Sequence, residues 1–197
     1  MVGFNRRFSP LVEKMKGPLD SVSESKSFIM TVNAGAIPVD HWTQDPEIGG
    51  GRVLGEACHV IDLLRCLADA SVESFDVAGL VRANGPPRTD VASITLKFED
   101  GSFGVIHYLA NGHKALPKER LEVFCAGRVL VLDNFRKLTG YGWAGFNGKR
   151  LWRQDKGHSA CVAAFVRAVR AGTATPIPIE QILEVSRISI QASEKAG

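Results

Sequence analysis

The segment VASITLKFEDGSFGVIHYL, residues 91–109, decides the fold class of this chain. Apolar residues alternate with polar ones on both sides of Glu99-Asp100-Gly101, and such alternation is typical of strands with one buried face. An Asp-Gly pair between two alternating runs predicts a β-hairpin, because glycine tolerates the positive φ that tight turns need. We therefore expect two directly joined antiparallel strands here.

Further strand candidates surround this hairpin. A second hairpin is expected to turn at Gly127-Arg128, and the end of one strand at Asp133 is expected to lead into a glycine-rich loop at residues 140–143. The expected strands are residues 26–33, 74–82, 91–99, 102–109, 120–126, 129–133 and 151–153.

Helices are expected near both ends of the strand-rich region. Ser9 as N-cap and Pro10 in the first turn predict a helix to Met15, and Gly17-Pro18 is expected to stop it. Apolar content and periodicity predict three more helices, at residues 53–67, 159–171 and 179–194.

This order of elements predicts an α+β fold, with an open, mostly antiparallel sheet and helices on one face. No G-x-G-x-x-G sequence follows a strand candidate, so no Rossmann domain is expected in this chain. Residues 1–197 are interpreted as a single domain. The other face of the sheet would leave a large apolar patch exposed, which favours a homodimer through that face.

Composition favours a soluble, cytoplasmic protein. Hydrophobic residues make up 45% of the chain and charged residues 23%, close to globular averages. No apolar run approaches the roughly 20 residues of a membrane span, and no signal peptide is evident, so no membrane partner is expected. A net charge of +3 with scattered basic residues predicts no nucleic-acid partner, but leaves an anionic small molecule open. Four widely spaced cysteines predict reduced thiols and no metal site.

The segment GGGRVLGEACHVIDLL, residues 49–64, carries the candidate chemistry. On an ideal α-helix its ionisable residues Arg52, Glu56, His59 and Asp62 share one side, opposite an apolar face. Ionisable groups on a mostly apolar helix must pair or face a cavity, which favours a polar pocket. His59 follows Glu56 by three residues, so the carboxylate is expected to orient the imidazole and raise its proton affinity, as acid/base catalysis requires.

Alternatives stay open for this segment and the loop before it. The same side chains could form a structural hydrogen-bond network around Arg52 or Arg65. The triple glycine at residues 49–51 could be a flexible loop, or could let the backbone approach a ligand. Trp42 could stack on a ligand ring, or could only anchor its loop.

Several of these motifs together resemble a known family. They are GFNRRFSP at residues 3–10, Asp45-Pro46 before the triple glycine, His59-x-x-Asp62, and FVRAVRAGTATPIPIEQILEVSRISIQAS at residues 165–193. They are similar to the C-terminal domain of the Gfo/Idh/MocA family of glucose-fructose oxidoreductases and inositol dehydrogenases. The likeness spans nearly the whole chain and is greatest to predicted polysaccharide-biosynthesis dehydrogenases fused to a zinc-type alcohol dehydrogenase module. It implies a C-terminal domain of the glyceraldehyde-3-phosphate-dehydrogenase-like or dihydrodipicolinate-reductase-like type.

The resemblance implies the substrate-binding and oligomerisation domain of an oxidoreductase that uses NAD or NADP and acts on a sugar, polyol or nucleotide sugar. In the family, a Rossmann domain binds the cofactor and supplies a lysine from a Glu-Lys-Pro motif, which this sequence lacks. We expect the chain to begin where that domain ends, with residues 1–16 as the junction helix, and to be inactive and cofactor-free alone. The alternatives are a non-catalytic dimerisation or sugar-binding module and a stand-alone lyase or isomerase.

The resemblance also implies roles for individual residues. His59 matches the family histidine, but the family aspartate four residues earlier falls on Gly55, so Glu56 is the expected substitute. His59 and Glu56 are thus the expected catalytic residues. The expected substrate-binding residues are Arg7, Asn33, Trp42 and Asp62.

Overall fold

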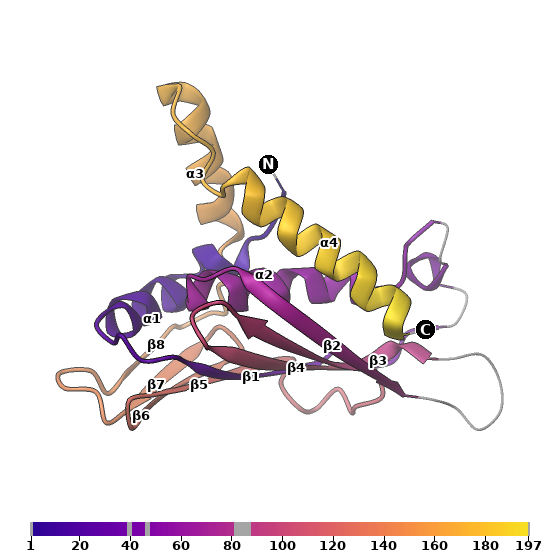
Figure 1. The fold of residues 1–197 in the computed structure, drawn as a ribbon, viewed down its shortest axis with the longest axis horizontal. Coiled ribbons are helices and arrows are strands. Elements are labelled where there is room, and N and C mark those ends of the chain that lie inside the picture. The colour runs from indigo at the N-terminus through magenta and orange to yellow at the C-terminus, as the bar shows by residue number, and fades with distance from the viewer. Residues whose placement is uncertain (1, 39–40, 46–47, 81–87, 197) are drawn as a thin grey trace.

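Eight strands form one open sheet in the computed structural model of this chain, which describes residues 2–38, 41–45, 48–80 and 88–196. The order across the sheet is β2-β3-β4-β1-β5-β6-β7-β8, and neighbouring strands are antiparallel except β1 and β4 (Figure 1). The expected α+β class with a mostly antiparallel sheet is confirmed. The strands are β1 (Ser27–Asn33), β2 (Val72–Leu80), β3 (Arg88–Phe98), β4 (Phe103–Leu109), β5 (Glu119–Cys125), β6 (Arg128–Asp133), β7 (Lys137–Tyr141) and β8 (Gly148–Arg150).

Both predicted hairpins are confirmed. β3 and β4 pair through the turn that contains Gly101, whose φ is +81°. β5 and β6 pair through Ala126 and Gly127, with φ of 48° and 68°. Two consecutive positive φ values match the right-handed twist of the flanking strands, which is why short hairpins favour this turn. The strand expected at residues 74–82 forms as β2, although residues 81 and 82 lie outside the described ranges.

Two expectations for the later strands are wrong. The segment 140–143, expected as a glycine-rich loop, begins inside β7, where Gly140 pairs with Leu130 of β6. A Cβ on Gly140 would lie 2.8 Å from the Phe146 ring, so glycine serves close packing there. The last strand is β8 and not residues 151–153. All three β8 residues are exposed, so no alternating pattern marks this edge strand in the sequence.

Helices cover one face of the sheet. Figure 1 shows α1, α2 and α4 above the strands, while α3 projects away from the body. The helices are α1 (Pro10–Asp20), α2 (Cys58–Ala68), α3 (His158–Ala171) and α4 (Ile179–Ala196), with short turns η1 (Arg6–Phe8), η2 (Trp42–Gln44) and η3 (Val53–Ala57). No helix in the described ranges combines the length and the apolarity needed to cross a membrane.

The predicted end of the first helix is wrong. α1 passes through Gly17 and Pro18 and ends at Asp20. A proline in the last turn removes one backbone hydrogen bond, and the N–H of Ser21 still reaches the carbonyls of Gly17 and Pro18 at 3.3 Å. Ser9 occupies the N-cap position, but its hydroxyl donates to the Asp155 carbonyl at 2.7 Å instead of capping the helix.

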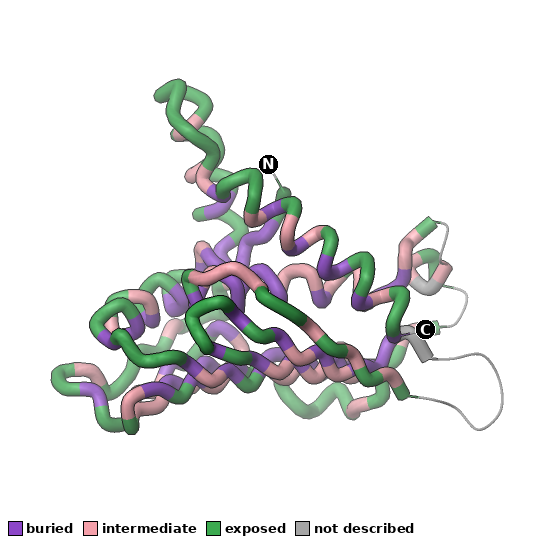
Figure 2. The backbone as a smooth tube through the Cα atoms, in the orientation of Figure 1, coloured by how far each residue is buried: buried purple, intermediate pink, exposed green. Residues whose placement is uncertain are grey.

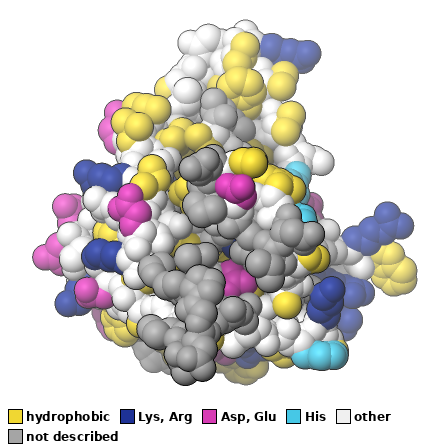
Figure 3. Space-filling view, turned by 90° about the vertical axis from the view of Figure 1, so that its right-hand side faces the viewer, with side chains coloured by type: hydrophobic (Ala, Val, Ile, Leu, Met, Phe, Trp, Pro, Cys, Tyr) yellow, Lys and Arg dark blue, Asp and Glu magenta, His cyan; other side chains and the backbone are white. Residues whose placement is uncertain are grey.

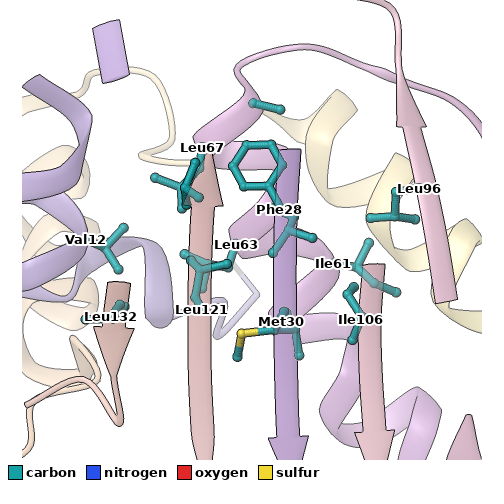
Figure 4. Packing of buried hydrophobic residues seen from close by; sticks show 14 of the residues in the cluster. Val12, Phe28, Met30, Ile61, Leu63, Leu67, Leu96, Ile106, Leu121 and Leu132 are labelled. Carbon is teal, nitrogen blue, oxygen red and sulfur yellow. The ribbon is translucent and has the colours of Figure 1, made fainter. Parts of the chain in front are cut away.

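The hydrophobic core lies between the helices and the sheet. Phe28 and Met30 of β1 and Ile106 of β4 point toward Ile61 and Leu63 of α2 (Figure 4), and all five side chains are fully buried. Burial of each such side chain contributes about 1.5–3 kcal/mol relative to exposure. Because strand side chains alternate between faces, this core accounts for every second residue of the central strands.

The other face of the sheet carries exposed apolar side chains. Ile29, Phe103, Phe124 and Tyr141 are between 39 and 58% exposed, and no element of the described ranges covers them. Strand pairing places Phe103 and Phe124 on either side of Ser27, in one row across β4, β1 and β5. These side chains lie among polar ones on the same face, such as Arg120 and Glu122 of β5, and the expected dimer contact through this face stays a prediction.

Candidate active site

The helical segment that carries Glu56 and His59 is not a uniform α-helix. η3 is a π-helical turn, and α2 follows it directly at Cys58. A π turn holds about one residue more than an α turn, so the 100° per residue that places the ionisable groups on one side does not apply. Such turns are frequent at functional sites. Glu56 inside the turn and His59 just after it consequently meet different neighbours.

His59 lies in the first turn of α2 with its ring edge-to-face against Phe4, the ring centroids being 6.0 Å apart. Its Nδ1 is buried without a hydrogen-bond partner among the described residues. Burial, and after it the positive charge of Arg6, lower the pKa of His59 to about 4. The charges of Glu119 and Glu56 oppose this shift without outweighing it. The expectation of a raised proton affinity is therefore wrong, and His59 is neutral near pH 7.

A buried ion cluster lies beside His59. The Nε of Arg6 donates to Glu119 Oε1 at 2.7 Å, and Lys156 contacts the other carboxylate oxygen. Glu119 is 1% exposed. Burial alone would raise the pKa of Glu119, but Arg6 and Lys156 outweigh it and lower the pKa below the ordinary value. The cluster joins η1, β5 and the segment before α3, so it holds these elements together next to the imidazole.

Glu56 is paired with two cations and has no hydrogen bond to His59. Lys118 donates to Glu56 Oε2 at 2.9 Å, and Arg52 approaches Oε1 at 3.4 Å. Burial opposes the charge of Glu56, but the hydrogen bond and charge of Lys118, followed by the charge of Arg52, lower its pKa below the ordinary value. Glu56 is thus a carboxylate held ionised by its neighbours, and it acts on His59 only through its charge.

Arg52 and Tyr108 are the buried residues of this cluster. Arg52 is buried and donates to the carbonyls of Gly35 and Ala34 at 2.6 and 3.2 Å. Its guanidinium lies over the Tyr108 ring, 5.7 Å from the centroid. The Tyr108 hydroxyl is fully buried and has no hydrogen-bond partner among the described residues. Burial raises the pKa of Tyr108, and the nearby charge of Glu56 adds to the increase.

The side chain of Asn33 holds a neighbouring loop in place. Its side-chain amide donates to the carbonyls of His113 and Leu116 at 2.8 and 3.0 Å and so holds the loop between β4 and β5. Its Oδ1 is buried against Gly112, where a Cβ would lie only 2.1 Å away. With 6% of the residue exposed, Asn33 is buried, and its expected contact with substrate stays a prediction.

Arg7 and Asp62 are also paired with each other. Two guanidinium nitrogens of Arg7 donate to the two oxygens of Asp62 at 3.0 and 2.5 Å, and a third reaches Gln181 at 2.9 Å. Asp62 is 0% exposed and Arg7 is 6% exposed. Arg7 lines a cavity of about 210 Å³ between α1, α2 and the start of α4. The Arg7–Asp62 pair joins η1 and α2, and Arg7 also reaches α4, while the expectation that the two residues form a polar wall for substrate stays a prediction.

Trp42 remains open to solvent. It is 62% exposed at the start of η2, with the His41 ring 6.0 Å away. The triple glycine that follows packs against the same turn, because a Cβ on Gly49 would lie 2.4 Å from the Trp42 carbonyl oxygen. Gly49 therefore serves an approach to the chain's own backbone, and Gly50 one to the Leu54 side chain. Asp40 and Pro46 of this loop lie outside the described residues.

The fold brings together groups that the sequence pattern did not connect. The strands β1 and β4 end at the same end of the sheet at which β3 and β5 begin. Tyr108, Lys118 and Glu119 therefore lie near the start of α2. Figure 3 looks onto this end of the molecule, where Lys and Arg side chains lie among carboxylates. No sequence signal distinguishes Lys118 or Glu119, because charged residues before a strand are common in solvated turns. The GFNRRF motif could have indicated Arg6.

Comparisons with known proteins agree with this fold. A model of the GFO/IDH/MocA C-terminal domain matches residues 26–130, more than half of the chain. The myo-inositol 2-dehydrogenase of Thermotoga maritima is 27% identical over 146 residues, which are 70% of this chain and 42% of the relative. An uncharacterised oxidoreductase of Bacillus subtilis is 27% identical over 152 residues, 70% of this chain and 41% of the relative. The chain thus spans about two fifths of the length of these curated relatives.

Solved structures share the fold along the whole chain. Levoglucosan dehydrogenase, solved with NADH and levoglucosan, has a TM-score of 0.79 at 20% identity and covers 100% of this chain, which covers 64% of it. The UDP-N-acetylglucosamine 3-dehydrogenase of Acidithiobacillus ferrooxidans has a TM-score of 0.75 at 16% identity, with 98% of this chain and 60% of that chain covered. Taken with the family model, these likenesses show that the chain belongs to the Gfo/Idh/MocA family and carries its C-terminal domain.

Proposed function

We propose that this chain is the substrate-binding and oligomerisation domain of an NAD(P)-dependent oxidoreductase that acts on a sugar, polyol or nucleotide sugar. The observation that carries the proposal is a neutral, partly exposed His59 at the start of α2, next to polar clusters at one edge of the sheet. Relatives with this domain include a myo-inositol 2-dehydrogenase and a levoglucosan dehydrogenase.

His59 would serve as the catalytic base. Since its pKa is lowered to about 4, the imidazole is unprotonated near pH 7 and can accept a proton from a substrate hydroxyl. Nδ1 is sealed from solvent, so Nε2 is the nitrogen that would meet the substrate. Once protonated, the ring would be stabilised by the negative charges of Glu119 and Glu56. Glu56 would thus contribute to catalysis through its charge.

The described residues do not fit a dinucleotide. Gly49, before η3, packs against the backbone of Trp42 and Thr43. β1 and β4 are the parallel pair of the described sheet; residues 34–52 between β1 and η3 are far longer than the tight turn of a dinucleotide site, and β4 leads to another strand. The chain is therefore proposed to be inactive alone and to depend on a separate cofactor-binding domain.

The surface of α3 supports this dependence. Val162, Phe165, Val166 and Val169 are 38–64% exposed and follow the i, i+3, i+4, i+7 spacing of one helix face. Figure 2 shows α3 as mostly exposed along its length. A continuous apolar stripe of this kind favours contact with another domain.

Binding experiments on the purified chain test the proposal. We expect at least one sugar of a panel that holds neutral and anionic sugars to shift the imidazole ¹⁵N resonances of His59, and no fluorescence change on addition of NADH or NADPH. Tight nicotinamide binding by the chain alone, or sugar binding that leaves His59 unperturbed, would contradict it.

A non-catalytic sugar-binding module is the second candidate. It is favoured by Gly55, which stands where the family resemblance places a catalytic aspartate. This candidate predicts sugar affinity that is unchanged in His59→Ala. It also predicts no turnover of the sugar when a cofactor-binding domain of a relative is supplied.

The open face of the sheet is the proposed homodimer contact. Its exposed apolar rows span the central strands, and an unpaired apolar sheet face on a soluble protein favours association with a second copy.

A further inference from the structure

The cluster around Glu56 contains a cation that the fold does not require. Arg52 is buried, and its guanidinium donates to backbone carbonyls of the loop after β1. The ammonium of Lys118 pairs with Glu56 alone among the described residues, and the side chain is 38% exposed, while the backbone carbonyl of Lys118 accepts from the Asn33 N–H at 2.7 Å. Arg52 and Lys118 thus both pair with the carboxylate of Glu56, and Lys118 is the more accessible of the two cations.

We propose that Lys118 binds the anionic group of the substrate, so that the site takes a sugar bearing a carboxylate or a phosphate and not a neutral polyol. This inference rests on the proposed function, since it places the sugar near His59. A lysine ammonium has three donors, and Glu56 uses one of them, which leaves two for a ligand. Because the Lys118–Glu56 pair is half-exposed on both sides, water screens it and a second anion can compete for the ammonium.

Tyr108 is a further neighbour of Glu56, which would help the carboxylate to lose its contact with Lys118. Its hydroxyl is buried beside Glu56. Burial and then the charge of Glu56 raise the pKa of Tyr108, and an interaction with Tyr108 adds to the lowering of the pKa of Glu56. Glu56 would therefore keep Arg52 and Tyr108 as neighbours while Lys118 binds the substrate anion.

A second lysine strengthens the positive charge at this edge. The hydrocarbon chain of Lys114 lies over Gly35, with its Cγ 3.6 Å from the place of a glycine Cβ. Gly35 is also the residue whose carbonyl binds Arg52. Lys114 has no ion-pair partner among the described residues, so its charge adds to that of Lys118. Asp90 is a further carboxylate at this end, but it is buried, at 5% exposure, and therefore does not meet a ligand.

The test compares three sugars that differ mainly in charge: glucose, glucuronate and glucose 6-phosphate. Binding to the full chain is measured by calorimetry and by the NMR shifts of His59. We expect at least one of the two anionic sugars to bind about tenfold more tightly than glucose, a difference of about 1.4 kcal/mol. The two anionic sugars distinguish a carboxylate site from a phosphate site. The preference should weaken at high salt, since the site is partly exposed.

Substitutions test whether Lys118 causes the preference for anionic sugars. Lys118→Met should abolish it and Lys118→Arg should retain it, whereas Lys14→Met removes the same charge from the exposed surface of α1 and should leave it unchanged. Glu56→Gln should strengthen anion binding, because it removes the competing carboxylate. Circular dichroism of each variant checks that the fold is intact.

The outcomes separate this inference from the proposed function. Equal affinity for all three sugars, or a preference that persists in Lys118→Met, overturns the inference and leaves the proposed function standing. Failure of the chain to bind any of the three sugars overturns both.

Discussion

At the scale of single residues, His59 illustrates how surroundings change a side chain's chemistry. In the sequence it stands three residues after a carboxylate, which predicts a raised pKa. In the structure the carboxylate is bonded to Lys118, and burial of the imidazole, followed by the charge of Arg6, lowers its pKa to about 4. The charges of Glu119 and Glu56 oppose this shift but do not outweigh it.

The lowered pKa predicts a pH dependence of stability. Histidine in the unfolded chain has a pKa of about 6.5, so as pH falls the unfolded state takes up this proton before the folded state. The contribution of His59 is therefore full above about pH 6.5 and is lost toward pH 4, by at most about 1.4 kcal/mol per pH unit and less because the ring is partly exposed. Urea unfolding at pH 7 and pH 5 should show a smaller loss for His59→Gln than for the unaltered chain. Equal losses in both proteins would contradict the assignment.

Gly55 offers a direct test of the missing family carboxylate. It is exposed, and nothing lies within 4 Å of the position of a Cβ. Gly55→Asp should fold with a free energy of unfolding within about 1 kcal/mol of the original, since aspartate favours a helix slightly more than glycine does. Its charge, one turn before His59, should raise the pKa of the imidazole in an NMR titration. Gly55→Asn is the uncharged control, and identical titration curves for the two variants would exclude the effect.

At the scale of elements, the Arg7–Asp62 pair ties η1 to α2 inside the protein. Removal of one partner leaves a buried charge uncompensated, so Arg7→Met or Asp62→Leu should lower the free energy of unfolding by about 3–5 kcal/mol. The double variant should recover much of this loss, because two apolar side chains replace the pair. The exposed Lys16–Glu13 pair is the control, and Glu13→Gln should cost under about 1 kcal/mol in urea unfolding. If both single variants changed the free energy of unfolding only slightly, the pair would not hold η1 against α2.

The junction before α3 depends on a glycine for two reasons. Gly157 has a φ of +83°, and a Cβ would lie 2.4 Å from the Asn5 carbonyl oxygen. Gly172, after α3, has a φ of +62° but nothing within 4 Å. Gly172→Ala should cost about 1 kcal/mol from backbone conformation, whereas Gly157→Ala should cost more because η1 must also move. Thermal unfolding of both variants checks this order, and equal costs would show that the close contact is unimportant.

At the scale of the whole molecule, the open sheet face predicts the oligomeric state. Lysine substitutions at Ile29 and Phe103 should convert a dimer into a monomer in sedimentation analysis, because charges cannot be buried there without partners. Val162→Lys on α3 removes a similarly exposed apolar side chain and should leave the dimer intact. Dissociation by Val162→Lys alone would move the contact to α3.

The sequence by itself determined the α+β class, both hairpins and the core positions of the central strands. These features follow from local rules: alternation of apolar residues marks one buried face, and glycine between strands permits a tight turn, although the second turn, expected at Gly127-Arg128, lies one residue earlier at Ala126-Gly127. The polar edge strand β8 and the proline inside α1 were missed, since neither carries a local pattern that opposes the simpler interpretation.

Only the tertiary structure decided the partners of the candidate site residues. Arg7 with Asp62, Arg6 with Glu119, and Glu56 with Lys118 are far apart in sequence, and their pairing depends on which strands end at the same edge of the sheet. The phase of the π turn, which sends Glu56 and His59 to different neighbours, likewise has no sequence signature. Local periodicity specifies which face of an element is buried, but electrostatic partners are chosen by the packing of distant elements, so the chemistry of His59 became evident only in the folded chain.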